Sequence, residues 1–98
     1  MATTTERLRA AHIKIDEARD RVQADSAASP VLVAVVNEFA MKAAKAAAAA
    51  DERTAVIELE QAGDSAKAAA EADPAVSDVA RQAVIDAHMA ICIAKGKL

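Results

Sequence analysis

Apolar residues recur along this chain at steps of three and four positions, with polar residues between them, which is the spacing of amphipathic helices. The longest such run extends from Pro30 to Gln61 and contains no glycine and no further proline. One stripe within it holds eight positions: Leu32, Val36, Phe39, Ala43, Ala46, Ala50, Thr54 and Ile57. The pattern predicts a single long helix over residues 30–62, with Gly63 as its stop signal.

Three shorter helices are predicted around this long one. The first spans about residues 4–25, starts at a cap from Thr4 or Thr5, and has an apolar stripe with three-four spacing. A short return helix follows at 64–72, with Asp64 or Ser65 as its cap, and a last helix covers 74–95 and ends before Gly96. The pairs Ser29-Pro30 and Asp73-Pro74 each combine a capping residue with a proline, which is typical of a helix start.

These elements predict an all-α fold in one domain, residues 1–98, built as an antiparallel three-helix bundle with a long central helix. An alternative comes from a change near Asp51. Beyond it, Val56 and Leu59 lie nearly opposite the earlier apolar stripe, and their spacing continues through Gly63. A break near Asp51 would give a four-helix bundle instead.

Composition narrows the possible functions. The chain has a net charge of −3, and its charges of both signs are interleaved without a basic run, so nucleic acid is not an expected partner. No apolar run is long enough to span a bilayer, and the first residues lack the apolar core of a signal peptide. The single cysteine, Cys92, fits a reducing compartment, so we expect a cytoplasmic protein with no membrane contact.

The residues that carry chemistry are few. His88 and Cys92 share a helix face at a spacing of four, but two ligands do not make a metal site. The favoured interpretation is that Cys92 is a small buried side chain and His88 lies at the polar boundary of the helix. His12 and Asp16 have the same spacing and are expected to form a surface ion pair. The only glycines, Gly63 and Gly96, are placed at predicted helix ends, so no phosphate-binding loop is present. The sequence therefore predicts neither an enzyme nor a bound cofactor or metal.

The last predicted helix is apolar nearly all round in its second half, because Ile85, Met89 and Ile93 lie opposite its alanine-rich face. Val56 and Leu59 form a second apolar group on the far end of the long helix. We expect these five residues to form an interface in a non-catalytic protein–protein interaction module, most simply a homodimer. Two alternatives are a small antagonist of viral or antitoxin type that blocks a larger protein, and a metal-responsive sensor that uses His88 and Cys92.

Overall fold

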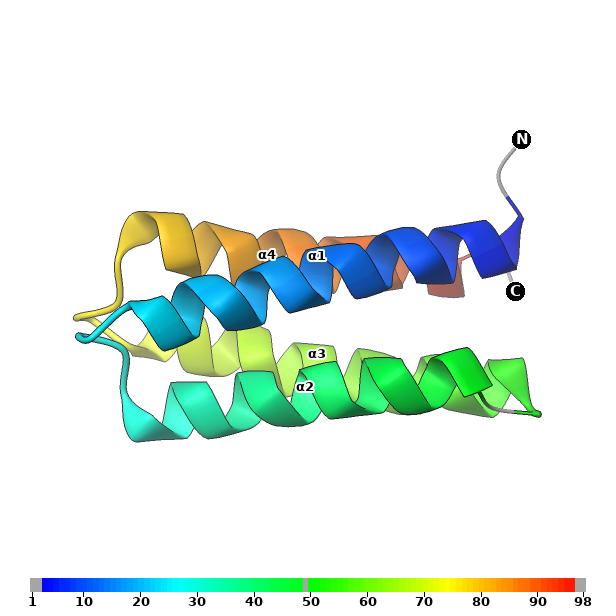
Figure 1. The fold of residues 1–98 in the computed structure, drawn as a ribbon, viewed down its shortest axis with the longest axis horizontal. Helices are drawn as coiled ribbons and strands as arrows, with labels where there is room; N and C mark the ends of the chain where they lie inside the picture. Colours follow the sequence, from blue (N-terminus) through cyan, green and yellow to red (C-terminus); the bar gives the residue numbers. More distant parts are fainter. Residues whose placement is uncertain (1–2, 49, 97–98) are drawn as a thin grey trace.

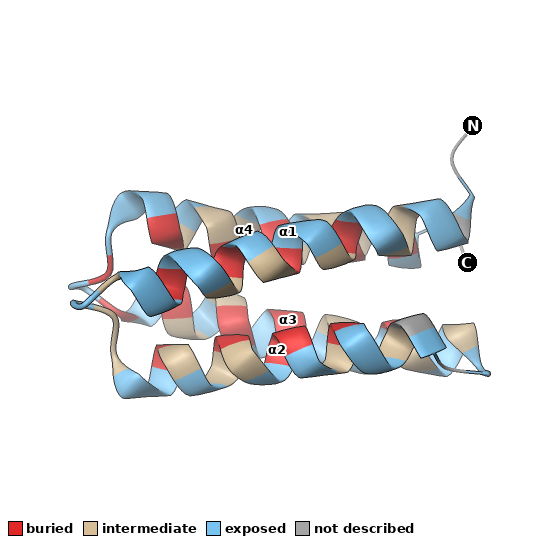
Figure 2. Cartoon of the chain, viewed as in Figure 1, coloured by how far each residue is buried: buried red, intermediate tan, exposed pale blue. Residues whose placement is uncertain are grey.

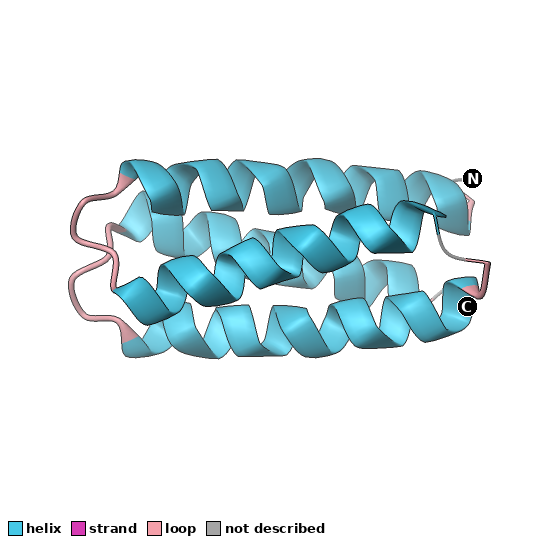
Figure 3. Ribbon diagram, turned by 60° about the horizontal axis from the view of Figure 1, so that its bottom comes forward, coloured by secondary structure: helices cyan, strands magenta, loops and turns pink. Residues whose placement is uncertain are grey.

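The computed structural model describes residues 3–48 and 50–96, and these residues form an antiparallel bundle of four helices (Figure 1). Helix α1 spans Thr4–Ala24, α2 spans Pro30–Ala48, α3 spans Glu52–Ala72 and α4 spans Asp78–Lys95. Helix α1 packs beside α2 and α4, and α3 packs beside the same two helices. Both chain termini and the α2–α3 connection lie at one end, and the other two turns lie at the opposite end (Figures 1 and 3).

The predicted three-helix bundle with a helix over 30–62 is wrong, and the alternative with a break near Asp51 is confirmed. The break occurs because Asp51 caps α3. Its carboxylate accepts hydrogen bonds from the Thr54 amide (3.2 Å) and the Thr54 hydroxyl (2.8 Å). These bonds satisfy donors at the start of the new helix, and helix propensity alone does not reveal them.

Gly63 does not end a helix, and the predicted return helix over 64–72 is part of α3. A glycine inside a helix costs about 1 kcal/mol relative to alanine, which packing can offset. At Gly63 the packing partner is Phe39 of α2. A Cβ atom at this position would lie 3.1 Å from the Phe39 ring and 3.3 Å from the His88 ring. The missing side chain therefore allows α3 to approach its neighbours closely.

Other helix ends also differ from the prediction. Helix α1 is capped by Thr3, whose hydroxyl accepts from the Glu6 amide, and not by Thr4 or Thr5. Helix α4 starts four residues later than predicted, because Ser77 and not Asp73 is its N-cap. The predicted start of α2 at Ser29-Pro30 is confirmed by a 3.1 Å bond from the Leu32 amide to the Ser29 hydroxyl. Gly96 is confirmed as the C-cap of α4.

The core runs along the inward faces of all four helices, as the red segments in Figure 2 show. Phe39 is its largest member. The fully buried large side chains are Ile15, Val22, Leu32, Val36, Phe39, Val56, Leu59, Val84 and Ile91. Many remaining core positions are alanine, so the helices gain stability by close approach as well as by the area they bury. Within the described part of the chain, no helix has the length and apolar character needed to cross a membrane.

The chain consists of two similar hairpins. The sequence of hairpin 1 (α1 and α2) aligns with that of hairpin 2 (α3 and α4) at an offset of 48 positions. The similarity is clearest in the turns, where residues 24–29 are ADSAAS and residues 72–77 are ADPAVS. Buried positions coincide at this offset. The equivalent core pairs are Ala11/Leu59, Ile15/Gly63, Ala18/Ala66, Val22/Ala70, Leu32/Ala80, Val36/Val84, Phe39/Ala87 and Ala43/Ile91. The bundle thus has an approximate two-fold axis parallel to its helices.

A reciprocal pair of aspartates joins the two hairpin turns at the end away from the termini. Asp25 Oδ2 accepts from the Ser77 amide (2.7 Å), and Asp73 Oδ2 accepts from the Ser29 amide (2.7 Å). The second oxygen of each carboxylate accepts from its own turn, at Ala27 and Ala75. We call these four residues, Asp25, Ser29, Asp73 and Ser77, the aspartate clasp.

The amide donors of the clasp stabilise both carboxylates in their charged form. The Ser77 amide, followed by the Ala27 amide, holds the pKa of Asp25 below its usual value. The Ser29 amide, followed by the Ala75 amide, lowers the pKa of Asp73 in the same way. Asp73 is also the most buried charged side chain among the described residues, at 6% exposure. Both aspartates are therefore ionised at neutral pH and bind the two turns to each other.

Candidate interaction surface

The outward face of α4 carries an apolar row in its second half. Ile85 is half-buried, Met89 is 56% exposed and Ile93 is 48% exposed. At steps of four residues the three side chains follow one another along a single face of the helix. We call these three residues the α4 apolar stripe. It is the part of the predicted interface that lies at the surface.

The other two predicted interface residues belong to the core. Val56 is fully buried and Leu59 is 2% exposed, both on the inward face of α3. Because α3 starts a new helix after Asp51, its apolar face turns toward α2 and α4 instead of away from them. Val56 and Leu59 therefore stabilise the monomer and offer no surface to a partner.

Two polar contacts between α4 and α3 border the α4 apolar stripe on the side that faces α3. His88 Nε2 pairs with an oxygen of Asp64, and Lys95 Nζ lies 2.9 Å from Glu60 Oε1. The Glu60 hydrogen bond and charge raise the pKa of Lys95 above its usual value. The Lys95 ammonium is thus charged and held against α3. Asp64 leaves most of its carboxylate open to solvent, with 61% of its side chain exposed.

Cys92 lies beside this edge, half-buried, with its Sγ 3.7 Å from His88 Nε2. Burial raises the pKa of its thiol, and the negative charges of Glu60 and Asp64 raise it further. The thiol therefore stays protonated at neutral pH, which is unfavourable for a nucleophile or a metal ligand. No group of three or more His, Cys, Asp and Glu side chains in the described residues is placed to hold a metal ion. Among the described residues, His88 and Cys92 therefore have no third such side chain placed beside them to complete a metal site.

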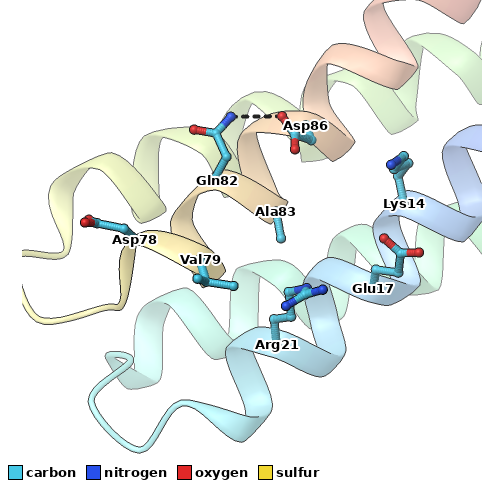
Figure 4. A pocket seen from close by; sticks show the side chains of 8 residues that line it. All are labelled: Lys14, Glu17, Arg21, Asp78, Val79, Gln82, Ala83 and Asp86. Carbon is cyan, nitrogen blue, oxygen red and sulfur yellow. Dashed lines mark hydrogen bonds between the residues drawn. The ribbon is translucent and has the colours of Figure 1, made fainter.

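The edge that faces α1 opens into a polar groove of about 590 Å³ between α1 and the first half of α4 (Figure 4). Basic residues Lys14 and Arg21 stand on its α1 side, and Asp86 stands on its α4 side. Gln82 donates to Asp86 Oδ1 at 2.9 Å, the contact drawn in Figure 4. The charges of both signs, together with the small Val79 and Ala83, leave the groove without a specific binding chemistry of its own.

A smaller hollow of about 310 Å³ lies where α1, α2 and the start of α3 meet. Its lining includes the apolar Leu8 and Leu59 together with the basic Arg9 and with His12. His12 Nε2 is 3.5 Å from Asp16 Oδ2, which agrees with the predicted surface ion pair.

Several exposed apolar residues were not identified from the sequence as surface positions. They are distributed over all four helices: Ile13, Val31, Met41, Ile57 and Val79. The most informative is Met41 of α2, which is 61% exposed and equivalent to Met89 in the hairpin repeat.

The repeat provides an internal comparison between the two methionines. Met41 is flanked at four-residue distance by Asn37 and Lys45, whereas Met89 is flanked by Ile85 and Ile93. The neighbours of Met41 on the outer face of α2 are therefore polar, whereas the equivalent neighbours of Met89 on α4 are apolar. This difference follows from the sequence once the repeat is aligned.

Comparison of the chain with protein-family models, with curated proteins and with solved structures finds no match.

Proposed function

We propose that this protein is a non-catalytic helical interaction module that binds another protein through the α4 apolar stripe. The observation that carries this proposal is the contrast between equivalent faces of the two hairpins. Ile85, Met89 and Ile93 stand where α2 has Asn37, Met41 and Lys45. Adjacent exposed apolar side chains lower the free energy of a complex when a partner removes them from water, and a solvated helix has no need of them.

The stripe fits an amphipathic helix of the partner. Its three side chains extend over about 12 Å of α4, which is roughly two helical turns, and helix faces of this size pack by placing side chains into the spaces of the opposite helix. The exposed carboxylates nearest the stripe, Asp64 and Asp86, flank it on opposite sides. The complementary partner helix has an apolar stripe with basic residues at its margins.

A different protein is favoured over a second copy for two reasons. The monomer buries Val56 and Leu59 by itself, so its core does not need a partner for completion. A second copy would also carry the same net charge of −3, so the overall electrostatic interaction between two copies is unfavourable. An antagonist that occupies the surface of a larger protein is one form of such a module.

The test uses a photo-crosslinking amino acid at position 89, with position 41 as its matched control, in cells that produce the protein. We expect a covalent adduct with another protein from position 89 and none from position 41. The double substitution Met89→Glu and Ile93→Glu is then expected to weaken binding of the identified partner at least tenfold, because it places charges in the contact. Circular dichroism of the double variant should remain that of the folded bundle, since both side chains are about half exposed.

Two results would contradict the proposal. One is an adduct formed only between two copies of this chain, which would assign the stripe to self-association. The other is equal crosslinking at positions 41 and 89, which would mean that the apolar stripe confers no selectivity. If the partner is an enzyme, its rate with and without the wild-type protein shows whether the module is an antagonist.

A further inference from the structure

The hollow where α1, α2 and α3 meet extends from the surface into the core of the bundle. Its apolar lining comes from all three helices: Leu8 from α1, Ala43 and Ala46 from α2, and Leu59 from α3. Leu59 and Ala43 are both buried core residues. A molecule that enters the hollow therefore meets apolar side chains at its inner end.

The hairpin repeat gives a reason for the hollow. At the offset of 48 positions, Ala43 is equivalent to Ile91, and Leu8 is equivalent to Val56. Ile91 and Val56 are both fully buried, so large side chains occupy the corresponding space between α3 and α4. In hairpin 1 the small side chain of Ala43 leaves this space unfilled. The hollow is thus a difference between two otherwise similar hairpins.

Two opposite charges line the hollow together with this apolar surface. Arg9 belongs to α1, and Glu52 belongs to the first turn of α3. Neither side chain takes part in an ion pair among the described residues. His12, the remaining ionisable side chain of the lining, lies 3.5 Å from Asp16. Arg9 and Glu52 are therefore the charges of the lining that can meet a ligand.

The hollow has the size and the composition of a site for a small amphipathic molecule. Its volume is about 310 Å³, which is at the lower end of the range for small-molecule sites. Such sites are mostly apolar and contain a few polar groups that fix the orientation of the ligand. A ligand with one apolar group and two opposite charges is complementary to the whole lining.

We infer that this hollow binds a free α-amino acid with an apolar side chain. The ligand carboxylate pairs with the Arg9 guanidinium, its ammonium pairs with the Glu52 carboxylate, and its side chain fills the space beside Ala43. The Thr5 hydroxyl, also in the lining, is a further hydrogen-bonding group for the polar end of the ligand.

The two charges of the lining favour a zwitterion over a simple acid or amine. An apolar carboxylic acid would bring its negative charge near Glu52 without compensation, and an apolar amine would do the same with its positive charge near Arg9. The inference is independent of the α4 apolar stripe, since the described residues of the lining belong to α1, α2 and α3.

An NMR titration of the isotope-labelled, full-length protein with L-leucine tests the inference. We expect saturable shift changes at the amides of the lining residues. Three analogues each lack one feature of leucine: isocaproate lacks the ammonium, isoamylamine lacks the carboxylate, and glycine lacks the apolar side chain. Each analogue should bind at least about tenfold more weakly than leucine, because one contact with the lining is lost.

Substitutions in the lining locate the site. Arg9→Gln and Glu52→Gln should each raise the dissociation constant of leucine about tenfold, since each removes one charge pair. Arg19→Gln and Glu71→Gln are the matched controls, because they change the net charge equally outside the lining and should leave the constant unchanged. Ala43→Ile introduces the equivalent residue of hairpin 2 and should abolish binding by filling the hollow. Circular dichroism verifies that each variant is folded.

Three outcomes would overturn the inference. The first is the absence of saturable shift changes at millimolar leucine. The second is isocaproate binding as tight as that of leucine, which would assign the hollow to anions and leave Glu52 without a role. The third is unchanged affinity in both Arg9→Gln and Glu52→Gln, which would place the ligand elsewhere. The Met89→Glu and Ile93→Glu substitutions should leave leucine binding unchanged, so failure of the proposed function and failure of this inference are separable.

Discussion

Gly63 shows how one residue can have opposite meanings in sequence and in structure. In the sequence it is a stop signal, because glycine weakens helices. In the structure it lies in the middle of α3, where its missing side chain accommodates Phe39 and His88. Phe39 is fully buried in α2, so it has little room to move away. The glycine is thus required by packing between helices and not by backbone conformation.

This role predicts the effect of Gly63→Ala. The added methyl group would lie 3.1 Å from Phe39 Cζ, closer than ordinary van der Waals contact. Overpacking of this kind costs about 1–3 kcal/mol, which exceeds the gain of about 1 kcal/mol in helix propensity. We expect a net loss of about 1 kcal/mol in the free energy of unfolding, measured by urea denaturation.

Gly96→Ala is the control for that measurement. A Cβ atom at Gly96 would lie 3.6 Å from the nearest atoms, which is an ordinary contact. Its stability should change by less than about 0.5 kcal/mol. A Gly63→Ala protein more stable than the wild type would show that the Phe39 ring can shift and that the close packing is not required.

Particular side chains stabilise the helix ends, and the C-terminal end of α3 is stabilised by a residue of another helix. It has no basic residue in its last turn. Instead, Arg81 of α4 reaches back and donates from Nε to the Ala70 carbonyl (3.3 Å) and from Nη2 to the carbonyls of Asp73 (3.0 Å) and Val76 (3.1 Å). These bonds satisfy carbonyl groups that a helix end leaves unpaired. The equivalent position in hairpin 1 is Val33, so this bracing is specific to hairpin 2.

Arg81→Ala should therefore destabilise the protein by about 2 kcal/mol, since hydrogen bonds from a charged group to partly buried carbonyls are lost. Hydrogen exchange should increase most in the last turn of α3. Arg81→Lys should restore little, because an ammonium cannot reproduce the planar set of donors. The control is Arg19→Ala, whose ion pairs to Asp16 and Asp20 are 3.8 Å long and exposed, and should cost less than about 0.5 kcal/mol. Equal losses in the two alanine variants would contradict the bracing role.

For the whole molecule, the aspartate clasp links the two hairpins and makes their association depend on pH. The pKa values of Asp25 and Asp73 are lowered in the folded protein by amide donors from the opposite turn. A lowered folded pKa means that the contribution to stability is present above the unfolded pKa of about 3.9 and disappears as the pH falls through the folded value. Acid should therefore loosen the contact between the hairpin turns.

We expect the free energy of unfolding to fall as the pH is lowered below about 4, and to fall less steeply in the double variant Asp25→Asn, Asp73→Asn. Urea denaturation between pH 2 and pH 7 measures both slopes. A residual dependence should remain, because the Thr54 hydroxyl and amide also lower the pKa of Asp51. Identical slopes in the variant and the wild type would exclude the clasp as a source of acid sensitivity.

Much of the local structure could be derived from the sequence by itself. Three-four spacing and the alanine content determined that the chain is helical, and Ser29-Pro30 and Gly96 determined two of the helix ends, because these signals act within a few residues. The positions of Met89 and Ile93 on the outer face of the last helix were derived in the same way. For these features, neighbours along the chain supply the deciding interactions.

Tertiary structure decided the rest. Gly63 and Phe39 are distant in sequence, so only their contact shows that the helix continues through the glycine. The start of α3 at Asp51 turned Val56 and Leu59 into the core, which removed them from the predicted interface. The repeat is weak in sequence because large residues of one hairpin stand where the other has small ones, as at Ile15/Gly63 and Phe39/Ala87. At one of these positions, Gly63, the small residue makes room for the Phe39 ring. The fold therefore depends on complementarity between the two hairpins. This complementarity cannot be derived from the order of residues along the chain, because it involves residues that are distant in sequence.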